Sequence, residues 1–284
     1  GIDHHVFNLG DHFDSLVVGP YVADHAAGRT PNPCIECNRH IKFGRLLDRA
    51  RALGFGLLAT GHHARVVVRP DGTRRIARAA DAAKDQSYVL HMLDQDQLAS
   101  LLLPIGDLTK DEVRRRAAGL GLRTADKPDS QDVCFITREH GREDFLRRSL
   151  TLTPGRVVDG SGAEVGSVAA VELVTVGQRR GMALAGGAAP RFAVDVDVPG
   201  ATVTVGSIDD LMVDATPLEA FSWADGPVVG RVLVQTSAHG SCDPAVLDDG
   251  VVRWAEPRPR VALGQSVVFY DGDQVLGGSI ARRA

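Results

Sequence analysis

The pattern of this 284-residue chain changes near residue 150. Before that point, apolar residues recur at helical spacing, as in Phe43, Leu46, Leu47 and Ala50, with Gly54 as a stop signal. After it, Gly, Pro and Val dominate and helical spacing disappears. We therefore predict an α/β domain followed by an all-β part made of two modules.

Several elements are predicted individually. Residues 57–59 form a short apolar strand that ends in the turn Thr60-Gly61-His62-His63, where an α/β sheet places ligands. Thr109 and Glu112 form a capping box that opens a helix. Alternating Val residues on both sides of Pro199-Gly200 indicate a β-hairpin. Further strands are predicted at 228–234, 251–254, 266–270 and 274–276, with a hairpin turn at Asp271-Gly272, which favours a small barrel or sandwich.

The first six residues have the pattern of a strand edge entered within a fold. A parallel sheet that began here would be short for the helices that must cover it. We therefore expect that earlier strands of this domain precede Gly1.

The composition excludes several classes of protein. Hydrophobic residues make up 44% and charged residues 24%, as in soluble globular proteins, and the net charge of -4 gives no general attraction to nucleic acid. No apolar run approaches a membrane span, and we expect no signal peptide. Four cysteines do not make a disulfide scaffold, so a reducing cytoplasm is expected.

Cys37 and Cys134 each lie in a polar, turn-rich stretch, whereas structural cysteines usually lie in apolar runs. Asn38 is a plausible N-cap, so Cys37 would precede a helix whose N-terminus lowers the thiol pKa. Two reactive thiols remote in sequence suit a nucleophile and its resolving or sulfur-carrying partner. The competing interpretation makes Cys134 a core residue beside Phe135 and Ile136.

Cys34 and Cys37 form a C-x-x-C motif. It is half of a zinc site or a redox pair, or it simply fills a loop. A second C-x-x-C is missing, and a mixed site with His62 or His63 lacks the usual paired spacing.

Two polar motifs remain. Residues 177–181, Gly-Gln-Arg-Arg-Gly, combine two cations with backbone freedom and suit phosphate contact, although an ordinary basic turn has the same composition. The run from Lys84 to Tyr88 is by itself typical of a solvated loop.

Together these motifs resemble, in order, those of the bacterial tRNA-specific 2-thiouridylase (tRNA-uridine 2-sulfurtransferase) family. The matching stretches are 28–33, 37–38 with 41–43, 59–62, 84–88, 104–110, 129–131 with 134–136, 177–181, 264–266, 269–270 and 276–278. They run along nearly the whole chain, so the ordered set is specific even though each motif alone is weak.

The resemblance implies a partial adenine-nucleotide α-hydrolase-like (PP-loop, Rossmann-like) domain at 1–140, a central β-rich domain at 141–211 and a C-terminal β-barrel at 212–284. It also implies an enzyme that adenylates the C2 oxygen of the wobble uridine with ATP, with Mg²⁺ expected and no tightly bound metal. A cysteine persulfide, charged by a sulfur-relay donor protein, then delivers sulfur to C2. The implied partners are tRNA and this donor, in a cytoplasmic monomer without membrane contact.

The resemblance assigns roles to individual residues. Cys134 matches the persulfide carrier, and Cys37 matches the second catalytic cysteine, which releases sulfide or closes a disulfide with Cys134. Gly61 falls at the ATP site. The positions implied near the target base or against the tRNA are Asn32, Pro33, Cys34, His62, Lys84, Asp85, Gln86 and Gln265. The uridine must leave its stack to reach Cys37.

Three departures from the family pattern qualify the resemblance. The Ser-Gly-Gly-Val-Asp-Ser phosphate loop is missing from the sequence and would lie upstream of Gly1, so weak ATP binding is expected. Many relatives have Asp at Cys34, which could instead form a decoy disulfide with Cys37. An Arg-aromatic pair that contacts tRNA in relatives falls near Ser237-Ala238, where no cation is present.

Two other functions compete with thiolation. One is a tRNA-binding fragment without catalysis, suggested by the missing phosphate loop and the retained basic motifs. The other is a thiol-disulfide redox protein that uses Cys34 and Cys37.

Overall fold

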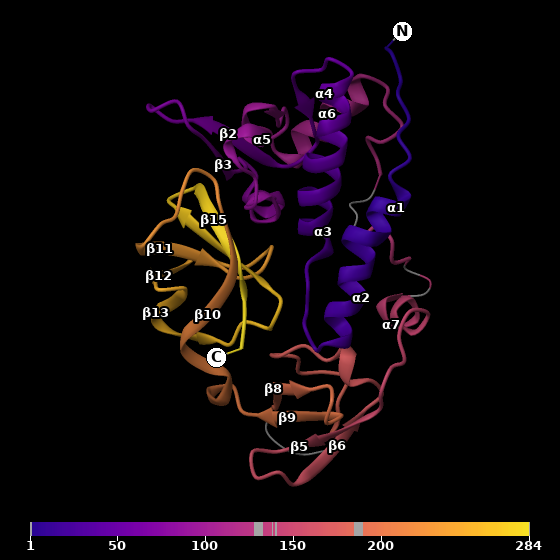
Figure 1. Cartoon of the computed structure of the whole chain (residues 1–284), viewed down its shortest axis with the longest axis vertical. Helices are drawn as coiled ribbons and strands as arrows, with labels where there is room; N and C mark the ends of the chain where they lie inside the picture. The colour runs from indigo at the N-terminus through magenta and orange to yellow at the C-terminus, as the bar shows by residue number, and fades with distance from the viewer. Residues whose placement is uncertain (1, 128–132, 138, 140, 185–189, 284) are drawn as a thin grey trace.

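Two helical rods stand side by side in the N-terminal part of the molecule (Figure 1). The structure is a computed structural model that describes residues 2–127, 133–137, 139, 141–184 and 190–283. The first rod consists of α1 (Gly10–Phe13), a π-helical stretch (Asp14–Val18) and α2 (Gly19–Ala26). The second consists of α3 (Pro33–Glu36), a π-helical stretch (Cys37–Leu46) and α4 (Leu47–Ala52).

The second rod begins earlier than the sequence predicted. Asn32 is its N-cap, because the Asn32 side-chain oxygen accepts a hydrogen bond from the Cys34 amide at 3.1 Å and Pro33 occupies the first turn. The expectation that Asn38 caps this helix is therefore wrong. Asn38 is buried inside the helix, and its side-chain amide donates to the Val89 carbonyl oxygen at 2.9 Å.

The remaining N-terminal elements are short. They are β1 (Leu58–Ala59), β4 (Leu101–Leu102), α5 (Gln95–Ala99), α6 (Lys110–Gly119), α7 (Gly141–Arg147) and 3-10 turns at Ala82–Lys84 and Ser87–Leu90. β1 and β4 pair in parallel, and the predicted strand at 57–59 and the capping box of Thr109 with Glu112 are confirmed. Residues 2–9 form no strand, so the expected strand edge at the start is wrong: these side chains are mostly exposed and lie outside any sheet.

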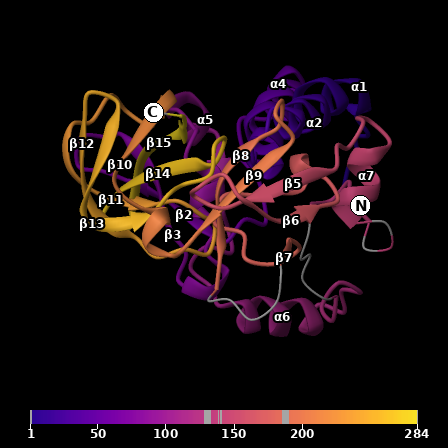
Figure 2. The same ribbon diagram turned by 90° about the horizontal axis from the view of Figure 1, so that it is seen from below.

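A five-stranded sheet forms the domain in the middle of the sequence, and it lies below α2 in Figure 1 and is seen again in Figure 2. Its strands are β5 (Gly155–Val158), β6 (Glu164–Val168), β7 (Ala183–Leu184), β8 (Phe192–Asp197) and β9 (Thr202–Gly206), in the order β7-β6-β5-β9-β8. The predicted hairpin is the antiparallel pair β8–β9. A 3-10 turn, Val171–Leu173, links this sheet to α2, where the buried His25 ring nitrogen Nδ1 lies 3.2 Å from the Glu172 carbonyl oxygen.

The C-terminal part closes into a barrel, following a 3-10 turn at Asp209–Leu211. Its strands are β10 (Met212–Trp223), β11 (Gly230–Gln235), β12 (Asp243–Asp248), β13 (Val251–Pro259), β14 (Ser266–Asp271) and β15 (Gln274–Ala281). β10 pairs with both β13 and β15, which leaves the ring without free edges. The predicted strands and the Asp271-Gly272 turn are confirmed.

A hairpin not predicted from the sequence joins the N-terminal part of the molecule to the C-terminal barrel. β2 (Ala64–Val68) and β3 (Arg74–Arg78) pair with each other, and β3 continues the sheet of the barrel through Ala77 opposite Gln274. The Arg78 amide also donates to the Asp273 carbonyl oxygen at 2.9 Å. The sheet of the C-terminal barrel therefore extends into the N-terminal part.

A glycine pair lets the barrel approach the N-terminal core closely. A Cβ atom at Gly278 would lie 2.5 Å from Nδ1 of the buried His91, and one at Gly277 would lie 2.3 Å from the Ser222 carbonyl oxygen. Gly277 also has φ +157°. Glycine is thus required where β15 meets β10 and the N-terminal domain. In the described ranges, no helix is long and apolar enough to span a membrane.

Candidate active site

Cys37 lies inside a helix rather than in the loop before one. It follows Glu36 at the end of α3 and opens the π-helical stretch Cys37–Leu46. π-Helical segments are rare and are often found at functional sites. Burial raises the pKa of the half-buried Cys37 thiol, and the Lys42 ammonium partly opposes this. The predicted lowering by a helix N-terminus is therefore wrong, because the helix begins a full turn earlier.

Cys134 is exposed in a turn, as the polar context predicted. Its neighbours anchor this turn: the Phe135 ring packs edge-on against Phe13 and Tyr21 at centroid distances of 5.6 and 5.5 Å, and Ile136 is buried. The interpretation of Cys134 itself as a core residue is therefore wrong. The motif 129–131 that precedes it lies outside the described residues.

The two sulfur atoms lie within electrostatic range of each other. A charge on Cys134 raises the pKa of Cys37, after the larger effect of burial. All four cysteines are free thiols, so neither a Cys37–Cys134 nor a Cys34–Cys37 disulfide is formed. The arrangement provides one accessible sulfur on a turn and one shielded sulfur on a helix.

Lys42 of this helix contacts a neutral histidine that lies beside it. The Lys42 Nζ is 3.4 Å from Nε2 of His62, whose Nδ1 is 2.8 Å from the Thr60 hydroxyl. Burial, aided by the Lys42 charge, lowers the pKa of His62 to about 4, so the ring is uncharged at neutral pH. His62 is 7% exposed, and it therefore presents little surface to a ligand.

Gly61 follows β1 at the carboxyl end of the parallel pair β1–β4, as predicted for a ligand-binding turn. A Cβ atom at Gly61 would meet nothing within 4 Å. The exposed backbone of this turn has room for a nucleotide to approach.

The loop in front of α3 is held by both β domains. Gln265 donates its side-chain amide to the Thr30 carbonyl oxygen at 2.6 Å, and the Thr30 amide donates to the Leu263 carbonyl oxygen at 2.7 Å. From the central domain, Thr175 accepts a hydrogen bond from the Thr30 hydroxyl at 3.2 Å. Beyond Thr30 the loop leads into Asn32, buried Pro33 and exposed Cys34. Gln265 thus supports the predicted base-binding loop from within the protein.

Lys84, Asp85 and Gln86 differ in exposure. Lys84 and Gln86 are exposed, and the Gln86 side-chain oxygen accepts from the His63 amide at 2.9 Å. Asp85 is 8% exposed and bonded to neighbouring protein groups. The sequence therefore located a surface loop correctly but did not distinguish its outward from its inward residues.

The basic motif Gly177–Gly181 forms a tight loop. Gln178 accepts from the Thr175 amide at 3.1 Å and donates to the Arg180 carbonyl oxygen at 2.7 Å, and Gly177 and Gly181 have φ +87° and +82°. Arg179 and Arg180 are exposed on it. The loop thus presents two cations on the central domain.

Neither alternative for the C-x-x-C motif gains support. Among the described residues, no group of three His, Cys, Asp or Glu side chains could hold a metal ion. Redox pairs of this kind lower a thiol pKa, whereas the pKa of Cys37 is raised.

Lys42 and Arg78 carry no signal in the sequence that would predict a role for them. Lys42 follows Cys37 by five residues, the hydrogen-bond spacing of a π-helix, but nothing in the composition predicts a π-helix there. Arg78 becomes noticeable only once β3 is seen to join the barrel.

Comparisons with known proteins agree with this architecture. Residues 1–138 match the family profile described as a tRNA methyl transferase HUP domain, residues 143–207 a tRNA methyl transferase PRC-barrel domain, and residues 233–281 an aminomethyltransferase beta-barrel domain. The chain is 45% identical to the tRNA-specific 2-thiouridylase MnmA of Beutenbergia cavernae over 98% of its length and 77% of the relative. It is 46% identical to that of Streptomyces avermitilis, with the same coverage. Identity to the Acidothermus cellulolyticus protein is 44% over 100% of this chain and 80% of the relative.

A HUP domain followed by two β domains, in a chain with free thiols at Cys37 and Cys134, defines an enzyme of the tRNA-modifying class. Within this class, the chain belongs to the tRNA-specific 2-thiouridylase (MnmA) family.

Proposed function

We propose that this protein is a tRNA-uridine 2-sulfurtransferase that replaces the C2 oxygen of a tRNA uridine by sulfur. The observation that carries the proposal is the pair of free thiols, an exposed Cys134 and a shielded Cys37 within electrostatic range, in a chain of this family. Exposure suits Cys134 to accept sulfur from a donor protein. Shielding suits Cys37 to act only once tRNA has arrived.

ATP is the proposed co-substrate, with Mg²⁺ on its phosphates. The open turn at Gly61 fits a nucleotide, because it follows a parallel strand and has free space above its backbone. When bound, ATP supplies the adenylyl group that turns the uracil O2 into a leaving group. A hydrogen bond between the side chains of Thr60 and His62, the residues on either side of Gly61, stabilises the turn.

In the proposed reaction, the two cysteines carry the sulfur and then release it. The terminal sulfur of the Cys134 persulfide becomes bonded to C2 as AMP leaves, and the bond between that sulfur and the Cys134 Sγ breaks. The bond to the Cys134 Sγ is broken by the Cys37 thiolate, which attacks Sγ and closes a Cys37–Cys134 disulfide. If this happens before transfer, the outer sulfur leaves as hydrosulfide and then attacks C2; if it happens after the sulfur has bonded to C2, the outer sulfur leaves on the uridine. The two cysteines supply the two electrons that reduce the transferred sulfur, and an external thiol must restore them.

The proposed tRNA surface combines several loops. Asn32 through Cys34 lie on the helical turn before Cys37 and are proposed to hold the extruded base. Lys84, Gln86 and the exposed Arg179 and Arg180 are proposed to contact the RNA backbone, which such side chains bind by charge and hydrogen bonds.

Replacing the cysteines in cells tests this function. Cys134→Ser and Cys37→Ser should each reduce the 2-thiouridine content of tRNA by roughly a hundredfold or more, because a missing nucleophile cannot be replaced by its neighbours. Mass spectrometry of digested tRNA measures the product. Undiminished thiolation in Cys134→Ser would contradict the assignment.

The alternative of tRNA binding without catalysis makes a different prediction. It expects salt-dependent binding of tRNA, yet the same 2-thiouridine content with and without the protein. The two measurements on the unaltered protein therefore separate the two functions.

A further inference from the structure

Asp85 has no acceptor position left for a ligand. Its Oδ1 accepts from the Ala79 and Ser87 amides at 2.9 and 3.2 Å. Its Oδ2 accepts from the Arg78 guanidinium at 2.9 Å and from the Ser87 hydroxyl at 2.7 Å. A carboxylate offers about four lone-pair sites, and protein donors occupy all of them. Asp85 therefore acts inside the protein, although it lies between two exposed residues of the proposed RNA-binding loop.

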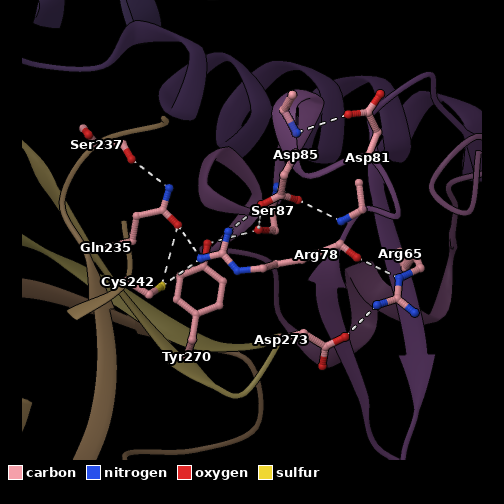
Figure 3. A network of polar contacts seen from close by, with 12 residues as sticks. Arg65, Arg78, Asp81, Asp85, Ser87, Gln235, Ser237, Cys242, Tyr270 and Asp273 are labelled. Atoms are coloured by element: carbon pink, nitrogen blue, oxygen red, sulfur yellow. Dashed lines mark hydrogen bonds and ion pairs between the residues drawn. The ribbon is translucent and has the colours of Figure 1, made fainter. Parts of the chain in front are cut away.

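Arg78 connects this carboxylate to the barrel (Figure 3). The Arg78 Nη1 bonds Asp85, whereas its Nη2 donates to the Gln235 side-chain oxygen at 2.6 Å and lies 2.8 Å from the Cys242 Sγ. The guanidinium carbon lies 4.3 Å from the centre of the Tyr270 ring. One side chain of β3 thus contacts β11, β14 and the segment before β12.

A second connection runs through hydroxyl groups. The Tyr270 hydroxyl is 3.0 Å from that of Ser87, which in turn donates to Asp85. Tyr270 and Ser87 are fully buried and Gln235 is 1% exposed, so this network excludes water on the barrel side. Arg78 itself is 28% exposed, so the buried part of the network is the side formed by Ser87, Gln235 and Tyr270. Hydrogen-bonded networks in such surroundings hold the groups they join in one arrangement.

We propose that Arg78 is a positioning residue for tRNA binding, which locks the Lys84–Gln86 loop to the C-terminal barrel so that Lys84 reaches the RNA backbone. This inference rests on the proposed function. The barrel thereby contributes to tRNA binding without touching the RNA at this point, by setting the place of a loop that belongs to the N-terminal domain.

A double-mutant cycle on tRNA affinity tests the role. Arg78→Lys keeps the charge, and so the general attraction to RNA, but replaces the two terminal nitrogens that bond Asp85 and Gln235 by a single ammonium on a shorter side chain. We expect Lys84→Ala to weaken tRNA binding by roughly tenfold and to reduce the salt slope by about one. Arg78→Lys should have a similar effect on the tRNA affinity and on the salt slope. In the Arg78→Lys background, adding Lys84→Ala should weaken tRNA binding by less than about twofold further.

The matched control is Arg69→Lys. Arg69 also joins the β2–β3 hairpin to the barrel, through Asp225 at 2.8 Å, but at the other end of the hairpin. It should leave tRNA affinity within about twofold of the unaltered protein. If Arg78→Lys lowers the melting temperature far more than Arg69→Lys does, Tyr270→Phe takes its place, since it removes only the hydroxyl contact with Ser87, and about threefold weaker binding is expected.

The outcomes are distinct. Unchanged tRNA affinity in Arg78→Lys overturns the positioning role. The same holds for Tyr270→Phe where that variant is used instead. Full additivity of the affinity losses in the double variant with Lys84→Ala also overturns it. These results leave the proposed function intact if the unaltered protein thiolates tRNA. Failure of the unaltered protein to bind tRNA at any salt concentration refutes the proposed function and the role of Arg78 together.

Discussion

Gln265 and Thr30, 235 positions apart in sequence, share a 2.6 Å hydrogen bond in which the Gln265 side-chain amide donates to the Thr30 carbonyl oxygen. Thr30 lies just before the helix that carries Cys37. Together with the bond from the Thr30 amide to the Leu263 carbonyl oxygen, this contact lets the barrel restrain the entrance to the proposed active site.

Gln265→Glu should weaken this restraint, because a carboxylate cannot donate to the carbonyl oxygen and the two acceptors repel each other. We expect a loss of about 1–3 kcal/mol in the free energy of unfolding, and a melting temperature lower by several degrees. Thiolation should fall as well. Gln274→Glu, the same change on β15, is the control, and equal losses in the two variants would contradict the proposed importance of the Thr30 contact.

Lys42→Met should make Cys37 less reactive at neutral pH. The Lys42 charge lowers the pKa of Cys37 against the larger raising effect of burial, so its removal raises that pKa further and decreases the thiolate fraction. The pH dependence of Cys37 alkylation, measured in a Cys34→Ser/Cys134→Ser/Cys242→Ser background, should shift to higher pH. Lys42→Arg keeps a positive charge and should shift the profile less; an unmoved profile in Lys42→Met would exclude the electrostatic effect.

Stability should decline in mild acid because three histidines are buried uncharged. Burial lowers the pKa of His25 and His62 to about 4 and that of His91 to about 3. Below pH 6.5, the unfolded chain binds protons at these positions that the folded chain does not, so stability is lost as the pH falls from about 6.5 toward 4. Each histidine contributes a slope of about 1.4 kcal/mol per pH unit in this range.

Urea unfolding at pH 7, 6 and 5 measures this slope. His91→Leu should reduce the slope of the unfolding free energy with pH by the contribution of one histidine. This holds whatever the effect of the change on the absolute stability. An unchanged slope in that variant would show that His91 does not titrate in this way.

Gly278→Ala should separate the barrel from the N-terminal core. The added methyl would lie 2.5 Å from the His91 ring, which has no room to move. We expect destabilisation by about 1–3 kcal/mol, typical of overpacking. Gly119→Ala, at a position where a Cβ meets nothing within 4 Å, should be neutral or slightly stabilising; equal effects of the two changes would contradict the close-packing argument.

Local patterns predicted much of this fold. The capping box at Thr109 and the turns at Pro199-Gly200 and Asp271-Gly272 depend on neighbouring residues, and the structure confirms each. The helix start at Asn32 was missed because Asn38 has equal capping chemistry, and only burial of its side chain excludes it.

Long-range features could not be predicted in this way. Alternation in β2 and β3 does not indicate that Ala77 will pair with Gln274, since register between distant strands depends on the whole fold. For the same reason, the sequence placed Asp85 correctly in a loop but did not reveal that Arg78 and Ser87 occupy its carboxylate.

The pairing of β3 with β15 has a consequence for synthesis. Arg78 emerges from the ribosome long before Gln235 and Tyr270, with which it later shares a buried network. Contacts of such sequence separation form late and slowly. The Lys84–Gln86 loop therefore acquires its final support only when the last strand has been made, and a chain that stops before β14 would carry both cysteines but lack this support.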